Sequence, residues 1–488
     1  MNAIDYFFAE SKKSEQLFIL NENEQISHAQ LFNNVERLAF NFKQKFGSGK
    51  NILLYSNNSY FFVLAYLSII KSGNVCVPIN PAAKKEITGF IINETKPDLC
   101  IVQGRFERNL EEFSLNYYTE TDIEDILKKQ QTDSVLINSN TFDDNQTAEI
   151  IYTSGSTALP KGVMLSHKNL IANTESIIEY LQLTKDDRVL VVLPFYYCYG
   201  LSLMHIHLKV GGAIAFNNTF MFIGTVINNL KKYNCTGFSG VPSHFQILLR
   251  KSDSFKQTEF PDLRYVTQAG GKLHKTFISE FTDSFPKIKF WVMYGQTEAT
   301  ARLSYLRPDL LSKKLGSIGK AIPNVNLQLL SEDGKEVEEG EVGEIVACGN
   351  NIMKGYYNDP ELTKKTIRNG KLFTGDLAKK DKDGFFYLTA RKKEIIKVGG
   401  ERVSPKEIEE VIVNFKDVID CTIEGVFDEM LGERIKATIV INNINNEISL
   451  KKEILTHCKQ FLTTIKIPQE IVFEQQVRVN SSGKKVKH

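Results

Sequence analysis

The chain has 488 residues, which is too long for a single compact core, so we expect at least two folding units. Hydrophobic residues make up 42% of the sequence and charged residues 24%, as is ordinary for globular proteins in water. The 60 basic and 58 acidic side chains leave a formal net charge of +2, which gives no reason to expect nucleic acid or an anionic membrane as the dominant partner.

The N-terminus and the cysteines favour a cytoplasmic protein. Acidic residues stand in the N-terminal segment, where a signal peptide would have a basic start and an apolar run. The seven cysteines are scattered and form no Cys-x-x-Cys pair, so neither a disulfide framework nor a zinc cluster is indicated. The longest apolar stretch, residues 60–70, is too short to span a bilayer and is predicted to be a buried helix, so we expect no integral membrane segment.

The first part of the chain alternates between strand and helix patterns. Residues 51–80 are predicted to form a strand, a helix capped by Ser59 and closed by Gly73, and a second strand. Near-continuous apolar runs are typical of parallel strands covered on both faces, and they predict an α/β fold. Such runs recur at residues 98–102, 148–154, 188–195, 211–216, 263–270 and 288–295.

The pattern changes after Leu315. Residues 315–349 read as short strands separated by Gly, Pro and Asp-Gly, which predicts antiparallel β structure, and Asp383-Gly384 predicts a further hairpin. The fold class is therefore α/β, with α/β layers and a β-rich subdomain in a large N-terminal domain, followed by a small α+β domain. We place the boundary between residues 1–391 and 392–488.

The small domain is predicted to open with a helix after a charged segment. Ser404, Pro405 and Glu407 have the spacing of a capping box with proline at the first helical position, which predicts the start of this helix.

A loop rich in small and hydroxylated residues, Tyr152–Gly162, follows an apolar strand. Backbone N–H groups and hydroxyls of such a loop can converge on phosphate oxygens, and Lys161 can add positive charge. Taken alone, a chance turn is the alternative. The candidate nucleotide-binding residues of the loop are Thr153, Ser154, Gly155, Ser156, Thr157 and Lys161.

This loop resembles the phosphate loop of the adenylate-forming (AMP-binding) superfamily, which includes acyl-CoA synthetases, peptide-type adenylation domains and firefly-type luciferases. Ala158 stands where that loop usually has a second glycine, so some backbone freedom is lost. Residues 294–298, Tyr-Gly-Gln-Thr-Glu, are similar to a second signature of the family. The resemblance implies that Tyr294 stacks on the purine, that Thr297 reaches phosphate, and that Glu298 acts in catalysis by binding Mg²⁺.

Two further segments extend the resemblance. Asp376, at the end of Leu-Phe-Thr-Gly-Asp, would hold the ribose hydroxyls with support from Arg391. Lys393 would be the hinge of the small domain, and Gly399 and Gly400 would line the thiol channel. Without the family context, a turn aspartate and a solvated charged segment are the ordinary interpretations.

The C-terminus carries the last signature. In the family a lysine near the C-terminus reaches the reacting carboxylate and the α-phosphate, and Lys484 holds that position. Arg478-Val479 replaces the usual Pro-Arg before it, and a loose basic tail is the competing interpretation.

The substrate pocket is assigned by similarity to Tyr197, Val241, Gly270 and Gly271. Peptide-type adenylation domains place an aspartate in the first of these segments, whereas residues 194–205 contain no acid, so an α-amino acid is disfavoured. His205 and His207 point in different directions on a helix, so we expect core or surface histidines rather than a metal site.

The resemblance implies an ATP-dependent acid–thiol ligase. A carboxylate, of a fatty or aryl acid, attacks the α-phosphorus of ATP with the help of Mg²⁺, and the acyl group passes to coenzyme A. Transfer to the pantetheine of a separate acyl carrier protein is the nearest alternative. A non-catalytic nucleotide-binding homologue is a second alternative, motivated by Ala158 and Arg478-Val479.

Overall fold

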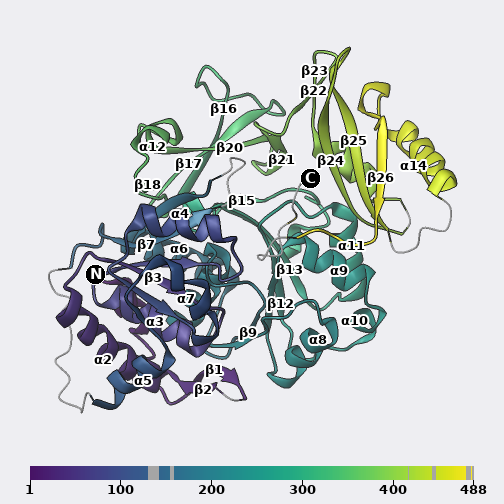
Figure 1. Ribbon diagram of the computed structural model, residues 1–488. Coiled ribbons are helices and arrows are strands. Elements are labelled where there is room, and N and C mark those ends of the chain that lie inside the picture. Colours follow the sequence, from purple (N-terminus) through teal and green to yellow (C-terminus); the bar gives the residue numbers. More distant parts are fainter. Residues whose placement is uncertain are drawn as a thin grey trace.

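The computed structural model describes residues 1–22, 24–129, 142–153, 159–415, 417–441, 447–479 and 485. Within these ranges two large sheets form the N-terminal part, and two smaller sheets follow them (Figure 1). The predicted fold class is confirmed.

The nine-stranded sheet has the order β15-β14-β13-β12-β11-β9-β10-β1-β2. Its strands from β13 to β1 are parallel, whereas β2, β14 and β15 pair antiparallel at the edges. Its bounds are β1 (Leu17–Asn21), β2 (Glu24–Ser27), β9 (Arg188–Val191), β10 (Ala213–Phe216), β11 (Gly237–Gly240), β12 (Tyr265–Gln268), β13 (Lys289–Tyr294), β14 (Ser304–Leu306) and β15 (Lys320–Ala321).

The seven-stranded sheet has the order β18-β8-β7-β4-β3-β5-β6, with a parallel centre. Its strands are β3 (Asn51–Tyr55), β4 (Val75–Ile79), β5 (Leu99–Val102), β6 (Tyr117–Tyr118), β7 (Thr147–Thr153), β8 (Lys161–Ser166) and β18 (Gly355–Tyr356).

Two five-stranded sheets make up the later part of the chain. The first contains β16 (Val325–Leu330), β17 (Gly343–Gly349), β19 (Ile367–Arg368), β20 (Lys371–Lys380) and β21 (Phe386–Arg391), all antiparallel as predicted. The second contains β22 (Ile396–Val398), β23 (Glu401–Val403), β24 (Val418–Asp428), β25 (Gly432–Ile441) and β26 (Glu470–Glu474).

Helices cover these sheets. The α-helices are α1 (Ala3–Phe8), α2 (His28–Phe46), α3 (Tyr60–Lys71), α4 (Lys85–Thr95), α5 (Glu120–Lys129), α6 (His167–Leu181), α7 (Cys198–Val210), α8 (Ile223–Lys232), α9 (Pro242–Arg250), α10 (Asp253–Gln257), α11 (Lys275–Ser284), α12 (Pro360–Thr366), α13 (Pro405–Ile412) and α14 (Glu447–Phe461). Short 3₁₀ turns are η1 (Gly104–Asn109), η2 (Glu111–Phe113), η3 (Thr297–Ala299), η4 (Pro308–Leu310) and η5 (Thr464–Lys466). No described helix is both long and apolar enough to cross a lipid bilayer.

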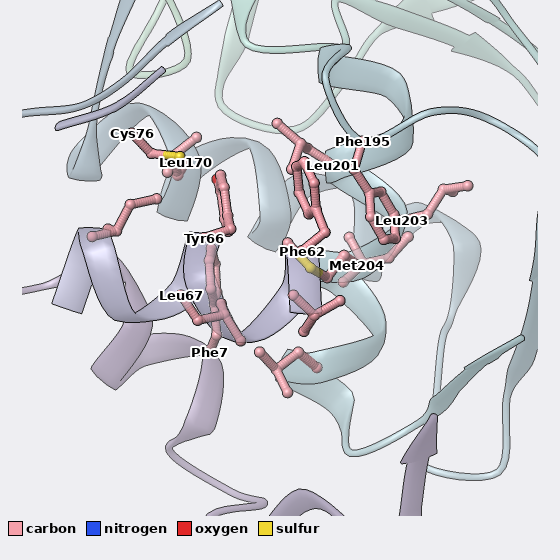
Figure 2. Close-up of a cluster of buried hydrophobic side chains, with 14 of the residues drawn as sticks. Phe7, Phe62, Tyr66, Leu67, Cys76, Leu170, Phe195, Leu201, Leu203 and Met204 are labelled. Carbon is pink, nitrogen blue, oxygen red and sulfur yellow. The ribbon is translucent and has the colours of Figure 1, made fainter. Parts of the chain in front are cut away.

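The strands of the seven-stranded sheet are apolar on both faces because both faces are covered. Ile52 and Leu54 of β3 join the core shared with the nine-stranded sheet, while Leu53 and Tyr55 face the core under α4. Helices α3 and α7 fill the space between the sheets, where Phe62 and Tyr66 of α3 lie near the buried side chains of α7 (Figure 2). Because these strands are buried on both faces, apolar and polar residues do not alternate along them.

The predicted strand–helix–strand unit is confirmed. Ser59 caps α3 by accepting from the Phe62 N–H at 3.2 Å, and Gly73 ends the helix with a φ of +82°. Strands β3 and β4 pair in parallel. The predicted hairpin at Asp383-Gly384 joins β20 to β21.

The predicted capping box at α13 is wrong. The helix does begin at Pro405, but the Ser404 hydroxyl donates to the Thr389 carbonyl at 2.5 Å, and the Glu407 carboxylate pairs with Lys466 at 2.7 Å. Both side chains therefore have tertiary partners that replace the local cap.

The C-terminal sheet packs beside α9 and α11 of the N-terminal part (Figure 1). Gln246 of α9 donates to Asp420 of β24 at 3.0 Å. Glu410 of α13 accepts from the Lys275 backbone N–H at 2.9 Å and pairs with Lys272 at 3.4 Å. Although burial alone would raise the pKa of Glu410, its cationic neighbours lower it to about 2. These contacts hold one orientation of the two parts, while the boundary at residue 391 stays a prediction.

The histidines of α7 are core residues, as predicted. His205 Nε2 lies 2.9 Å from the Tyr66 hydroxyl, and His207 Nδ1 lies 2.8 Å from the Leu203 carbonyl oxygen. Among the described residues, no group of three or more His, Cys, Asp or Glu side chains is arranged to hold a metal ion.

The buried Glu149 carboxyl makes stability depend on pH. Burial raises its pKa above the ordinary value of 4.5 to about 7, although the hydrogen bond from Tyr66 at 2.7 Å opposes this. Between these values the folded chain holds a proton that the unfolded chain releases, so the free energy of unfolding falls as pH rises, by about 3 kcal/mol. We expect Glu149→Gln to remove this dependence. Urea unfolding at pH 4.5, 6 and 8 measures it, and an unchanged pH profile would contradict the assignment.

Candidate active site

Three of the predicted site segments lie at one edge of the nine-stranded sheet. Strands β9, β11, β12 and β13 are parallel neighbours, so their carboxyl ends meet at the same edge. Val241 follows β11, Gly270 follows β12, and Tyr294 ends β13, so that residues 295–298 follow this strand. The edge outside the carboxyl ends of parallel strands is where open α/β sheets bind ligands.

The predicted phosphate loop connects β7 to β8. Thr153 ends β7 and is the register partner of Lys161, which begins β8, and its hydroxyl donates to the Lys161 carbonyl at 3.4 Å. Ser154, Gly155, Ser156 and Thr157 lie outside the described residues. The two antiparallel strands therefore present both ends of this loop at one place.

Glu298 and Lys161 both lie beside the Tyr356 side chain. The Tyr356 hydroxyl donates to Glu298 Oε1 at 2.8 Å, and Lys161 Nζ lies 5.6 Å from the centre of the Tyr356 ring. Burial, reinforced by the Glu298 carboxylate, raises the pKa of Tyr356, so its hydroxyl stays a donor. Strand β18 carries Tyr356 and pairs with β8, which explains why a residue so late in the chain reaches the loop.

A second group joins Tyr294, Asp376 and Arg391. The Tyr294 hydroxyl donates to Asp376 Oδ2 at 2.8 Å, and Arg391 Nε donates to Asp376 Oδ1 at 2.9 Å. Asp376 and Arg391 are register partners on β20 and β21. Burial, followed by the Asp376 charge, holds the pKa of Tyr294 well above its usual range. The carboxylate of Asp376 is thus oriented from two sides.

The predicted pocket residues lie beside these groups. Tyr197 stands just before α7, and the adjacent Cys198 Sγ lies 3.4 Å from the Thr297 hydroxyl. A Cβ added to Gly271 would lie 3.3 Å from the ring of Pro242, next to Val241, so the loops after β11 and β12 are in contact. Tyr197 is therefore next to a residue that contacts Thr297, and Val241 and Gly271 lie on two loops that touch each other.

The predicted glycine loop lies in the second five-stranded sheet, and the predicted hinge residue precedes this sheet. Gly399 and Gly400 form the two-residue turn between β22 and β23, with φ of +55° and +87°. Two successive positive φ values are the requirement of a type I′ hairpin turn, which glycine meets without strain. The exposed Lys393 lies in the turn that connects β21 to β22.

Lys484 lies outside the described residues. Its neighbour Lys485 is described, and Lys485 Nζ lies 3.0 Å from Asp420 Oδ2, the same carboxylate that Gln246 of α9 contacts. Lys485 therefore lies at the contact between the two parts of the chain.

The described side chains fit a nucleotide with Mg²⁺. Glu298 Oε2 has no hydrogen-bond partner within the described ranges, so one carboxylate oxygen is available for a cation. Mg²⁺ in phosphate-transfer sites takes one or two carboxylates and completes its shell with phosphate and water. Lys161 has no described carboxylate partner and can face phosphate.

Sequence reasoning missed Tyr356. It lies in the two-residue strand β18 and carries no motif of its own, so its place beside Glu298 follows only from the pairing of β18 with β8. The Gly-Tyr-Tyr run at residues 355–357, rich in aromatic side chains, was the available signal.

Comparisons with known proteins agree with this arrangement. The profile of the AMP-binding enzyme family matches residues 8–357, and that of the AMP-binding enzyme C-terminal domain matches residues 407–484. Oxalate–CoA ligase of Arabidopsis thaliana is 29% identical over 478 residues, covering 94% of this chain and 91% of that protein. Long-chain-fatty-acid–CoA ligase of Yersinia pestis is 33% identical over 343 residues, covering 69% of this chain and 60% of that ligase, less than two thirds of its length.

A solved structure extends the likeness to the whole fold. ATP-bound MatB from Rhodopseudomonas palustris has a TM-score of 0.89 at 25% identity, covering 99% of this chain and 96% of that one. The region matched by the family profile contains Thr153, Lys161 and Glu298. The chain therefore belongs to the AMP-binding enzyme family, and its predicted resemblance to the acyl-CoA synthetases of the adenylate-forming superfamily is confirmed.

Proposed function

We propose that this protein is an ATP-dependent acid–thiol ligase that adenylates a carboxylic acid and transfers the acyl group to coenzyme A. The observation that carries the proposal is the series of contacts from Thr153 through Lys161 and Tyr356 to Glu298, together with the Tyr294–Asp376–Arg391 group, in which Tyr294 stands four residues before Glu298. Segments from three different sheets thereby supply the proposed cation, metal ligand and ribose acceptor.

In the first step, a carboxylate oxygen bonds to the α-phosphorus of ATP and the bond to pyrophosphate breaks. Two anions must approach each other, so repulsion and positioning dominate the barrier. Lys161 opposes this repulsion, while Asp376 and Arg391 hold the ribose end. Mg²⁺ on Glu298 would neutralise phosphate charge.

In the second step, a thiol sulfur bonds to the acyl carbon and AMP leaves with the bonding electrons. The mixed anhydride is a better acyl donor than the free carboxylate because AMP is a better leaving group. Coenzyme A is the proposed acceptor, supported by the relatives named as CoA ligases. The pantetheine of a carrier protein has the same thiol, and the test of the proposed function distinguishes this acceptor from coenzyme A.

The two steps are proposed to use different groups of the small domain. Rotation about Lys393 would bring Lys484 to the carboxylate for the first step and the Gly399-Gly400 turn to the thiol channel for the second. We expect Lys484→Ala to slow adenylate formation by about a hundredfold, because a cation at the reacting oxygens is lost. Thioester formation from a supplied acyl-adenylate should be spared. Lys487→Ala is the matched control. Equal loss of both half-reactions in Lys484→Ala would contradict the assignment of Lys484 to the first step alone.

The proposed function is tested by an acid panel. Pyrophosphate release is measured for fatty and aryl acids with coenzyme A, with a purified pantetheinylated carrier protein, or with no thiol. Thioester with coenzyme A supports the proposal, whereas thioester with the carrier protein alone assigns the alternative acceptor. Retained ATP binding without pyrophosphate release for any acid would identify a non-catalytic homologue.

A further inference from the structure

Arg302 is a buried cation in the connection between η3 and β14. Its side chain is among the largest fully buried ones, with 2% of the residue exposed. The backbone is fixed on both sides, because the Leu303 N–H donates to the Tyr294 carbonyl at 2.8 Å and the Asn351 amide donates to the Arg302 carbonyl at 2.8 Å. Arginine stays charged in proteins, so this position carries a permanent buried positive charge.

The guanidinium has few partners. Nη1 donates to the adjacent Ala301 carbonyl at 3.3 Å, the guanidinium lies 4.1 Å from the centre of the Tyr199 ring and also interacts with the Tyr180 hydroxyl, and the buried Nε has no hydrogen-bond partner among the described residues. No carboxylate within the described ranges lies at ion-pair distance from Arg302. These partners are neutral, so they supply no counter-charge for a cation that has lost its water.

Lys71 is a buried cation with a structural role, and it can be compared with Arg302. Its side chain is 4% exposed, and it pairs with two carboxylates, Asp5 and Glu36. Burial of a charge is tolerated when it is paired in this way. Arg302 is as deeply buried and lacks such a pair, so its counter-ion is missing from the described protein.

Arg302 lies beside the predicted acyl pocket. Tyr199, under the guanidinium, follows Cys198, whose sulfur contacts Thr297. The Tyr199 hydroxyl donates to the Thr267 carbonyl at 3.0 Å, near the carboxyl end of β12. The Tyr199 side chain therefore connects the Arg302 guanidinium to β12, the strand that leads to Gly270. Arg302 also lies on the same segment of the chain as Glu298.

We propose that Arg302 is a specificity-determining residue that binds a second anionic group of the acid substrate, so that the preferred substrates are dicarboxylic acids or acids with an equivalent distal anion. The inference rests on the proposed acid-activating function. The planar guanidinium matches a carboxylate through two parallel N–H···O bonds, which no neutral terminus can accept with equal strength. A ligand carboxylate would supply both the missing counter-ion and an acceptor for Nε.

Length-matched acid pairs test the inference. Butyrate is compared with succinate, hexanoate with adipate, and benzoate with the three benzenedicarboxylates, each scored as kcat/KM for exchange of labelled pyrophosphate into ATP. Wild type should favour the diacid of at least one pair by about 10-fold to 100-fold, the range of one charge-assisted interaction. Arg302→Met should abolish or reverse that preference, and Arg302→Lys should retain part of it. Arg307→Met, at an exposed arginine, is the charge-matched control.

The outcomes separate a specificity role from a structural one. A wild type that favours the monoacid in every pair overturns the inference, even if Arg302→Met does not fold. Loss of the same factor for monoacids and diacids in Arg302→Met overturns it too, since a packing role with Tyr199 affects all acids alike. Thermal stabilisation by diacids in the presence of ATP gives a readout without turnover. Diacid stabilisation that Arg302→Met removes, without exchange for any acid, would contradict the proposed function but support the anion site.

Discussion

Glu298→Gln is expected to slow acid-dependent exchange of pyrophosphate into ATP by about a hundredfold, the cost of removing one group that stabilises transition-state charge. Glutamine keeps an oxygen that can accept from Tyr356 at the position of Oε1, but it removes the negative charge that a magnesium ligand needs. The Mg²⁺ concentration for half-maximal rate should rise as well. Initial rates across a Mg²⁺ titration measure both effects.

Tyr356→Phe is the matched control for this prediction. It removes the 2.8 Å hydrogen bond and leaves the Glu298 carboxylate charged, so a loss of less than about tenfold is expected from one hydrogen bond. Equal losses in the two variants, with an unchanged Mg²⁺ requirement, would show that Glu298 acts only through its contact with Tyr356.

Asp376→Asn is expected to raise the KM for ATP by about a hundredfold, because two charge-assisted hydrogen bonds to ribose hydroxyls become weaker neutral ones. The buried Asp376 already accepts from Tyr294 and Arg391, which orient its carboxylate. The amide keeps the shape of the side chain, so the fold should persist. Steady-state kinetics with varied ATP, and direct binding of ATP by calorimetry, measure the change.

Asp383→Asn is the control for Asp376→Asn. Asp383 lies at the tip of the same hairpin, is 52% exposed and pairs with Lys314, so its change should leave the KM for ATP within about twofold. If the two variants bind ATP equally well, Asp376 does not hold the ribose.

Local signals predicted the elements that burial and turn chemistry decide. The apolar run Asn51–Tyr55, the cap at Ser59 and the glycine at position 73 each act over a few residues, and the structure confirms all three. The Asp383-Gly384 turn likewise brought β20 and β21 together, and their register places Asp376 opposite Arg391.

Tertiary contacts decided what local signals could not. Ser404 has the sequence of a helix cap, yet its hydroxyl reaches the Thr389 carbonyl of β21. Tyr356 joins the site through a strand of two residues, too short to give a periodic pattern. The lack of a carboxylate partner for Arg302 among the described residues is likewise invisible in the sequence, because it depends on every element packed around this side chain.

The central claim is that a carboxylate oxygen attacks the α-phosphorus of ATP at a site formed by Lys161, Glu298 and Asp376. Transfer of isotope tests it most directly: an accepted acid labelled with ¹⁸O in its carboxylate is turned over with ATP and coenzyme A, and the products are examined by mass spectrometry. One ¹⁸O atom should appear in AMP and none in pyrophosphate. Label in inorganic phosphate, with ADP as the nucleotide product, would mean attack at the γ-phosphorus and would contradict the account.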